Sequence, residues 1–167
     1  MKEPKLGTGL SSRDFFESGR FFTVSYEVRA EYAWDTGPAI GRYLEELKAG
    51  RIMGRRCTKC NRVFVPPRAF CELCFRPADD WVPLEDTGTI NTFSRCYITW
   101  DMQKLTSPEI PAVIEIDGAT PGHGIMHMIG GVDPDEIKVG MKVKAVWKPE
   151  SEREGAITDI KYWKPVS

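Results

Sequence analysis

The sequence lacks several features that define common protein classes. It has no run of about 18 consecutive apolar residues, the length that a membrane-spanning helix needs. Its first residues, MKEPKLGTGLSSRDFFESG, lack the apolar core of a secretory signal peptide. The motifs GxGxxG, GxxxxGK[ST], GxSxG and HExxH are missing. We therefore expect a cytoplasmic protein that makes no membrane contact, and no catalytic motif is evident.

The sequence also lacks an excess of charge of one sign. Its 167 residues carry 23 basic and 24 acidic side chains, which gives a formal net charge of −1. Residues 51–84 contain seven Lys or Arg and three Asp or Glu, whereas residues 85–167 contain nine and thirteen. A nucleic-acid-binding domain normally has a strong positive footprint. This distribution argues against nucleic acid as a partner.

The N-terminal region, residues 1–50, is expected to hold an arm and a helix. Apolar residues alternate with polar ones from Phe22 to Val28, which predicts a short strand. The segment 37–49 (GPAIGRYLEELKA) predicts a helix that has Pro38 in its first turn and Gly50 after its end. The arm is rich in aromatic residues. It either clamps a partner, since aromatics are enriched in interface cores, or covers one face of the following domain.

The C-terminal region, residues 85–167, contains short apolar runs separated by Gly, Pro and Asp. Five such strands at this spacing predict a small β-barrel. The predicted strands are Thr89–Phe93, Ala112–Ile116, Ile125–Ile129, Met141–Trp147 and Ala156–Tyr162.

Four of the five cysteines form two CxxC units in the middle region, residues 51–84. Cys57 and Cys60 are separated by ten residues from Cys71 and Cys74. Two CxxC turns can complete a tetrahedral shell of four sulfurs around one ion, and such a closed shell is structural rather than catalytic. Asn61, which follows the first unit, tolerates the left-handed backbone that such turns often need. We predict one zinc ion per chain, with a rubredoxin-type iron centre as the alternative.

The fifth cysteine and the two histidines indicate a functional site less clearly than the four CxxC cysteines do. Cys96 lies in a predicted strand and is expected to be a buried structural thiol, because a nucleophilic Cys needs a nearby base. His123 and His127 are four residues apart, which is about 13 Å along a strand, so they are poor joint metal ligands. They are expected to have structural or surface roles. A stand-alone hydrolase or redox protein would have to depend on these three residues.

The order of motifs resembles a known family. The segments LKAG, RIMGRRCTKC, VFVPPRAFCELC and LEDTGTINTFS, followed by PAVIEIDGA and IKVGMKVKAVW, resemble zinc-ribbon/OB-fold proteins associated with acyl-CoA enzymes. The resemblance covers about residues 37–167. It implies an α+β chain: an N-terminal arm and helix (1–50), a rubredoxin-like zinc ribbon (51–84) and a C-terminal OB-fold β-barrel (85–167).

The same resemblance implies a function. Family members are small accessory subunits of thiolase-like enzymes, whose large subunit carries the nucleophile, and some help to hold or pass coenzyme A thioesters. The segment YAWDTGPAIGRYLEELK is most similar to the small zinc-finger subunits of benzoylsuccinyl-CoA thiolases of anaerobic toluene degradation. We therefore expect a non-catalytic subunit that has Zn²⁺ as its cofactor and a thiolase-like catalytic subunit as its partner. An OB-fold nucleic-acid-binding protein stays as the alternative.

Arginine residues cluster around the cysteines. Guanidinium groups suit phosphate oxygens, and coenzyme A carries three phosphate groups. Arg55, Arg56 and Arg68 are the candidates for contact with it. The other interpretation is that these charges are solvated and offset the negative charge of a Zn(Cys)₄ centre.

Overall fold

The computed structural model describes Glu17 and residues 27–166 of the chain. Backbone contacts divide the chain after Trp34, and every element described below lies in the unit that starts at Asp35. Most of the predicted strand around Phe22–Val28 lies outside the described residues, and residues 27–36 have no regular secondary structure. No helix among the described residues is long and apolar enough to cross a membrane.

Helix α2 (Gly37–Lys48) leads into the ribbon. It confirms the helix predicted at 37–49, with Pro38 in its first turn. Its buried side chains are Ala39, Tyr43 and Leu47, which recur at helical spacing. Gly50 follows with a positive φ of 75°, which ends the helix and turns the chain into the ribbon.

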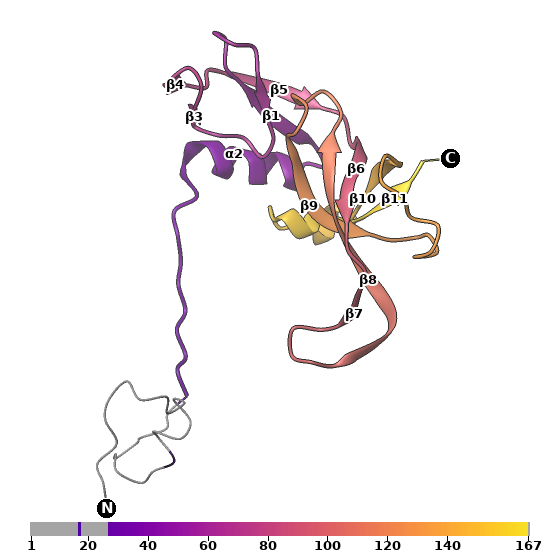
Figure 1. The fold of residues 1–167 in the computed structure, drawn as a ribbon. Coiled ribbons are helices and arrows are strands. Elements are labelled where there is room, and N and C mark those ends of the chain that lie inside the picture. The colour runs from indigo at the N-terminus through magenta and orange to yellow at the C-terminus, as the bar shows by residue number, and fades with distance from the viewer. Residues whose placement is uncertain (1–16, 18–26, 167) are drawn as a thin grey trace, which may run out of the picture. The chain divides into compact units, whose positions relative to one another are not determined.

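The ribbon consists of short antiparallel strands. A three-stranded sheet has the order β2-β1-β5, and a two-stranded sheet pairs β3 with β4 (Figure 1). Helix α2 packs against β1. The bounds are β1 Ile52–Arg56, β2 Val63–Phe64, β3 Phe70–Cys71, β4 Arg76–Pro77 and β5 Asp80–Leu84.

A five-stranded closed barrel follows the ribbon. Its strand order is β6-β10-β11-β9-β8, and pairing of β6 with β8 closes it. All of these pairs are antiparallel except β9 with β11, which is parallel. The chain therefore has the predicted α+β architecture. The bounds are β6 Thr87–Phe93, β7 Cys96–Ile98, β8 Lys104–Ile116, β9 Gly124–Ile129, β10 Lys142–Trp147 and β11 Ile160–Pro165.

One hydrophobic core joins the helix, the ribbon and the barrel. Tyr43 and Leu47 of α2 and Ile52 of β1 belong to the same buried cluster as the barrel residues, which include Ile114 and Trp163. The ribbon has a second, smaller cluster, made of Cys57, Phe64, Cys71 and Ala78, against which Cys60 and Cys74 pack. Cysteines therefore supply most of the ribbon's own core.

Two predicted strands differ from the structure. The last strand starts at Ile160 rather than at Ala156, because residues Ile157–Asp159 form a 3-10 turn, η2. Strand β8 begins at Lys104 rather than at Ala112. Its first half pairs with β7, and the two strands extend beyond the barrel as a hairpin (Figure 1). The predicted strands at the positions of β6, β9 and β10 agree with the structure to within two residues.

Candidate metal centre

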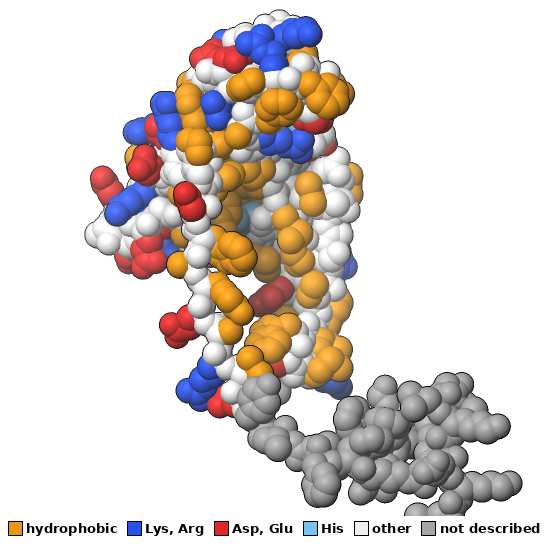
Figure 2. Space-filling model, turned by 90° about the vertical axis from the view of Figure 1, so that its left-hand side faces the viewer, with side chains coloured by type: hydrophobic (Ala, Val, Ile, Leu, Met, Phe, Trp, Pro, Cys, Tyr) orange, Lys and Arg blue, Asp and Glu red, His pale blue; other side chains and the backbone are white. Residues whose placement is uncertain are grey.

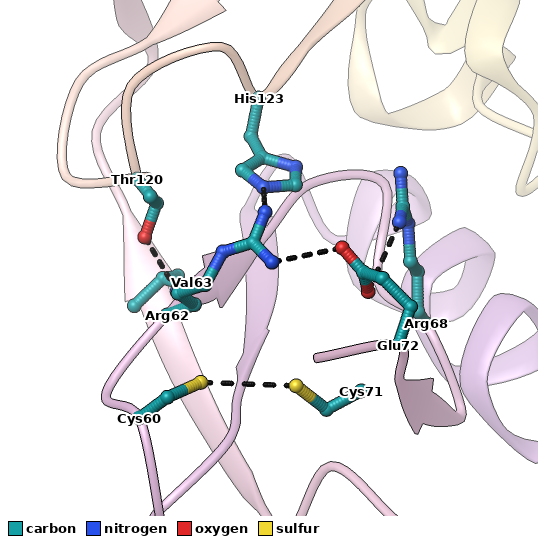
Figure 3. Close-up of polar contacts among 8 residues, drawn as sticks. All are labelled: Cys60, Arg62, Val63, Arg68, Cys71, Glu72, Thr120 and His123. Carbon is teal, nitrogen blue, oxygen red and sulfur yellow. Dashed lines mark hydrogen bonds and ion pairs between the residues drawn. The ribbon is translucent and has the colours of Figure 1, made fainter. Parts of the chain in front are cut away.

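The four cysteine sulfurs converge at one end of the ribbon. Cys57 follows β1, Cys71 ends β3, and Cys60 and Cys74 lie in the turns that follow them. All four Sγ atoms lie within 4.8 Å of one another. The Sγ atoms of Cys60 and Cys71 are 3.7 Å apart (Figure 3). The two CxxC units therefore meet as their spacing predicts.

The two turns have the same backbone geometry. The N–H of Asn61 donates to the carbonyl of Cys57 at 2.7 Å, and the N–H of Phe75 donates to that of Cys71 at 3.0 Å. Asn61 and Phe75 both have positive φ, 59° and 49°. The left-handed backbone expected at Asn61 is thereby found. It was not expected at Phe75, because a bulky aromatic residue rarely adopts it.

The cluster fits a tetrahedral zinc ion. At a Zn–S distance of about 2.3 Å, sulfurs at the corners of a tetrahedron are about 3.8 Å apart, close to the Cys60–Cys71 separation. Backbone N–H groups of Cys60 and Lys59 donate to the thiol of Cys57 and lower its pKa to about 7. Burial, together with the neighbouring sulfurs, raises the pKa of Cys74 to about 12. Adjacent thiolates repel one another, so a divalent cation is needed for all four to ionise.

Asp79 ties the first CxxC turn to the segment before β5. Its Oδ2 accepts from the hydroxyl of Thr58 at 2.6 Å, and its Oδ1 accepts from Arg76 at 3.1 Å. Its own N–H donates to the carbonyl of Arg56. The Thr58 hydroxyl, the Thr58 N–H and Arg76 together hold the pKa of Asp79 below its usual value. Nothing in the sequence pattern singled out this carboxylate.

A polar junction joins the ribbon to the barrel (Figure 3). Val63 donates its N–H to the Thr120 hydroxyl at 2.8 Å, and the N–H of Thr120 donates to the Val63 carbonyl at 3.1 Å. The guanidinium of Arg62 bridges His123 Nε2, at 3.1 Å, and the carboxylate of Glu72, at 2.8 Å. A ribbon side chain therefore contacts both a barrel residue and the second CxxC unit.

His123 is neutral in this junction. Burial lowers its pKa, and the positive charges of Arg62 and Arg68 lower it further. Because a guanidinium only donates hydrogen bonds, Nε2 must be the acceptor, and the ring proton must be on Nδ1. The edge of the ring also contacts Phe64, with centroids 5.3 Å apart. The structural role expected for His123 agrees with these contacts.

The three arginines considered for coenzyme A have different surroundings. Arg55 and Arg56 are consecutive on β1 and therefore face opposite sides of the sheet. Arg55 stacks on Trp81, 5.3 Å from the ring centroid, while Arg56 pairs with Asp80. Arg68 pairs with Glu72 at 3.3 Å and lies over Phe64. The structure records no contact that brings the three together.

The other candidate residues are also separated by their contacts. His127 Nε2 is 3.3 Å from the carbonyl of Ile157, and its Nδ1 has no partner. Cys96 lies in β7 opposite Glu109 of β8 and is partly exposed, rather than buried as expected. Neither residue shares a recorded side-chain contact with His123. The described residues therefore do not show a nucleophile with its base.

Two family models match this chain, one in the ribbon and one in the barrel. The rubredoxin-like zinc ribbon domain of ChsH2 matches residues 44–80, and the C-terminal OB-fold domain of ChsH2 matches residues 81–148. Together they cover residues 44–148, more than half of the chain. The chain belongs to this zinc-ribbon/OB-fold family. The zinc-ribbon match and the four-cysteine cluster fit one structural zinc ion per chain.

Individual relatives carry names from the same family or from acyl-CoA enzymes. A DUF35 domain-containing scaffold protein of Methanocaldococcus jannaschii is 28% identical over 118 residues, which are 69% of this chain and 82% of that protein. A probable enoyl-CoA hydratase alpha subunit of Thermomonospora curvata is 31% identical over 114 residues, 66% of this chain but only 34% of the relative. The chain therefore corresponds to about a third of that longer subunit.

A solved structure shares the fold. The Ltp2–ChsH2(DUF35) aldolase structure contains a chain that matches with a TM-score of 0.57 at 21% identity, covering 81% of this chain and 98% of that one. At this identity the match shows the fold of the zinc-ribbon/OB-fold family and nothing about activity.

Proposed function

We propose that this chain is a non-catalytic, zinc-containing subunit of an acyl-CoA enzyme complex. The observation that carries the proposal is the closed cluster of four sulfurs on a ribbon that shares one core with an OB barrel. A catalytic zinc keeps a position open for water, whereas a four-cysteine shell leaves none. The names of the relatives, a scaffold protein and an enoyl-CoA hydratase subunit, support an accessory role beside a larger enzyme.

We further propose that the partner is a thiolase-like enzyme, and specifically a benzoylsuccinyl-CoA thiolase. This proposal rests on the resemblance of residues 32–48 to the small subunits of such thiolases. In this proposal the partner carries the nucleophile and cleaves the carbon–carbon bond. This chain holds the complex together and shapes the entrance for the acyl-CoA.

The proposed zinc ligands are Cys57, Cys60, Cys71 and Cys74. We assign the ribbon that holds them to residues 51–84. The arm and helix (1–50) precede it, and the barrel (85–167) follows it. A bound zinc ion would cross-link the ribbon and would take no part in a reaction. The chain's own residues orient the sulfurs through the two CxxC turns and through Asp79. Metal ligation by four reduced cysteines suits a reducing compartment, so we place the protein in the cytoplasm.

Direct contact with coenzyme A is a separate part of the proposal. Arg68 has 52% of its side chain exposed and Arg56 has 42%, so each can reach a phosphate. Binding of coenzyme A to the complex is measured calorimetrically for the wild type and for Arg55→Gln, Arg56→Gln and Arg68→Gln. Weaker binding in at least one variant is expected. Equal binding in all three contradicts a role for these arginines.

The experiment that tests the function is purification of the untagged chain from its native host, followed by metal analysis. We expect a larger acyl-CoA enzyme subunit of the thiolase type to copurify, with about one zinc per chain. Recovery of the chain alone contradicts the subunit assignment. Recovery with nucleic acid, and a gel shift that weakens steeply with salt, would instead support the OB-fold nucleic-acid-binding alternative.

A further inference from the structure

We propose that the hairpin formed by β7 and the first half of β8 is the element that docks into the enzyme partner. The proposal rests on the function proposed above and adds the surface that would carry it. The hairpin extends beyond the barrel (Figure 1), and no residue from 91 to 109 is buried. A two-stranded hairpin by itself is marginally stable in water.

The tip of the hairpin carries large apolar side chains. Trp100 is 96% exposed, Met102 78%, Tyr97 55% and Ile98 49%. Trp100 and Tyr97 alone present on the order of 300 Å² of surface, because an aromatic side chain can bury about 150–250 Å². Exposed apolar side chains gathered on one protruding hairpin are typical of an interaction site.

Hydrogen bonds cross the turn that presents these side chains. Thr99 donates its N–H to the Gln103 carbonyl at 2.9 Å and accepts from the N–H of Gln103 at 3.0 Å through its hydroxyl. The same hydroxyl bonds to the carboxylate of Asp101. Met102 has a φ of 66°, which is unusual for a residue other than glycine. A turn fixed in this way lowers the entropy that binding would otherwise cost.

The shape of the hairpin indicates a concave occupant. Its exposed apolar residues lie both in β7 (Tyr97 and Ile98) and in the turn (Trp100 and Met102), and the hairpin protrudes from the barrel (Figure 1). A cleft encloses a protruding tip on more sides than a flat surface does. Two hairpin tips from two copies of this chain would bury much less than the about 800 Å² per partner of a stable interface. The occupant we assign is therefore an apolar cleft on the larger acyl-CoA enzyme subunit.

The charge of the tip argues against a membrane as the occupant. Residues 97–104 (YITWDMQK) contain one acidic and one basic side chain, Asp101 and Lys104, so the tip has no net charge. Peripheral elements that bind anionic lipid carry an excess of basic residues beside their apolar ones. An uncharged protein cleft suits this tip better.

The test places a photo-crosslinking residue, p-benzoylphenylalanine, at position 100 of the full-length chain in the native host. We expect a crosslink to the acyl-CoA enzyme subunit that copurifies with the wild type. In the purified complex, Trp100→Ser should raise the dissociation constant at least about tenfold, because a central Trp is a typical binding hot spot. Trp100→Phe should retain most of the affinity.

Two further variants distinguish docking from misfolding. Met102→Asn keeps a residue that tolerates the positive φ, so it should fold normally and bind more weakly. The matched control is Val139→Ser, which changes a side chain that is 64% exposed in the segment between β9 and β10, and should bind as the wild type does.

The outcomes separate the two proposals. If the wild type binds the enzyme subunit, but position 100 does not crosslink and Trp100→Ser binds equally well, the docking proposal is wrong and the subunit function stands. A crosslink to a second copy of this chain, or binding to phosphatidylglycerol vesicles that depends on Trp100, also overturns it. If the wild type binds no acyl-CoA enzyme subunit, the proposed function itself fails.

Discussion

At the scale of single residues, a buried carboxylate organises the loop before the last strand. Asp159 is fully buried, and its two oxygens accept from the backbone N–H groups of Glu154, Gly155 and Ala156 at 2.8–3.1 Å. Burial alone would raise the pKa of Asp159, but the three donors outweigh it and hold the pKa below its usual value. The loop therefore depends on an ionised side chain.

Asp159→Asn is expected to destabilise the protein at neutral pH. The amide NH₂ of Asn would face a backbone N–H, so at least one buried donor would lose its acceptor, at a cost of about 1–3 kcal/mol. Urea denaturation measures the difference. The control is Glu150→Gln on the nearby exposed turn, which should change the unfolding free energy by less than about 0.5 kcal/mol. Equal stability of Asp159→Asn and the wild type would contradict the role of this carboxylate.

His123, at the junction between the ribbon and the barrel, should make the stability of the folded protein depend on pH. The pKa of His123 is lowered in the folded state by burial and by Arg62 and Arg68. The unfolded chain therefore takes up this proton at a higher pH than the folded one does. The contribution of His123 to stability is complete above the unfolded pKa of about 6.5 and is lost as the pH falls through the folded value.

His123→Gln should remove this part of the pH dependence, because Gln offers Arg62 an acceptor that does not titrate. The free energy of unfolding of the zinc-loaded protein is compared at pH 7.5 and pH 5.5 for both forms. The wild type should lose more stability than the variant over this interval. Equal losses would mean that His123 does not carry the effect.

The role of a single residue was predictable from the sequence only where it depends on neighbouring residues in the chain. The two CxxC units and the left-handed Asn61 follow from local sequence, and the structure agrees with both. His123 and Arg62 are 61 positions apart in the sequence, so no local pattern reveals their contact. Trp81, which stacks with Arg42 and Arg55, was missed for the same reason.

At the scale of elements, the ribbon has little core apart from its cysteines. Its buried cluster contains Phe64 and Ala78 as the non-cysteine members. A segment with so small a core depends on its metal for folding free energy.

Cys57→Ser is therefore expected to lower zinc content to well below one per chain and to release the ribbon from its fold. Hydrogen exchange should accelerate in β1 and β2 while β8 and β9 of the barrel stay protected. Cys96→Ser is the matched control for zinc content, because Cys96 lies outside the four-cysteine cluster and its replacement should leave the zinc content unchanged. Full zinc content and normal assembly in Cys57→Ser would defeat the structural-zinc account.

Elements were predictable where apolar runs end at clear turn signals. Helix 37–49 and the strands at the positions of β6, β9 and β10 agree closely with the structure. The first half of β8 was missed because its residues KLTSPE are mostly polar and exposed, so they show no buried face. The start of β11 was placed too early because Asp159 holds residues 154–159 in a capped turn, although the run from Ala156 is apolar enough for a strand.

At the scale of the whole molecule, the surface combines basic and apolar groups. Figure 2 shows hydrophobic side chains beside Lys and Arg over the ribbon, where Phe70, Leu73 and Phe75 are exposed. All three acidic groups of the ribbon pair with arginine: Glu72 with Arg62 and Arg68, Asp79 with Arg76, and Asp80 with Arg56. Such a surface suits association with a larger protein better than tracking of a nucleic-acid backbone, which needs unpaired basic residues.

The fold class was predictable at this scale because motif order and barrel periodicity indicate the same architecture. The partner was not, because an interface depends on a second sequence. The central claim, that this chain is an accessory subunit, is tested by reconstitution. The larger acyl-CoA enzyme subunit that copurifies with this chain is purified and assayed for its activity alone, with this chain, and with zinc-depleted chain.

The account predicts low activity for the large subunit alone and none for this chain alone. Activity should rise with added chain until the two are present in the ratio of the native complex, and zinc-depleted chain should fail to restore it. Full activity of the large subunit without this chain, or turnover by this chain by itself, would contradict the account.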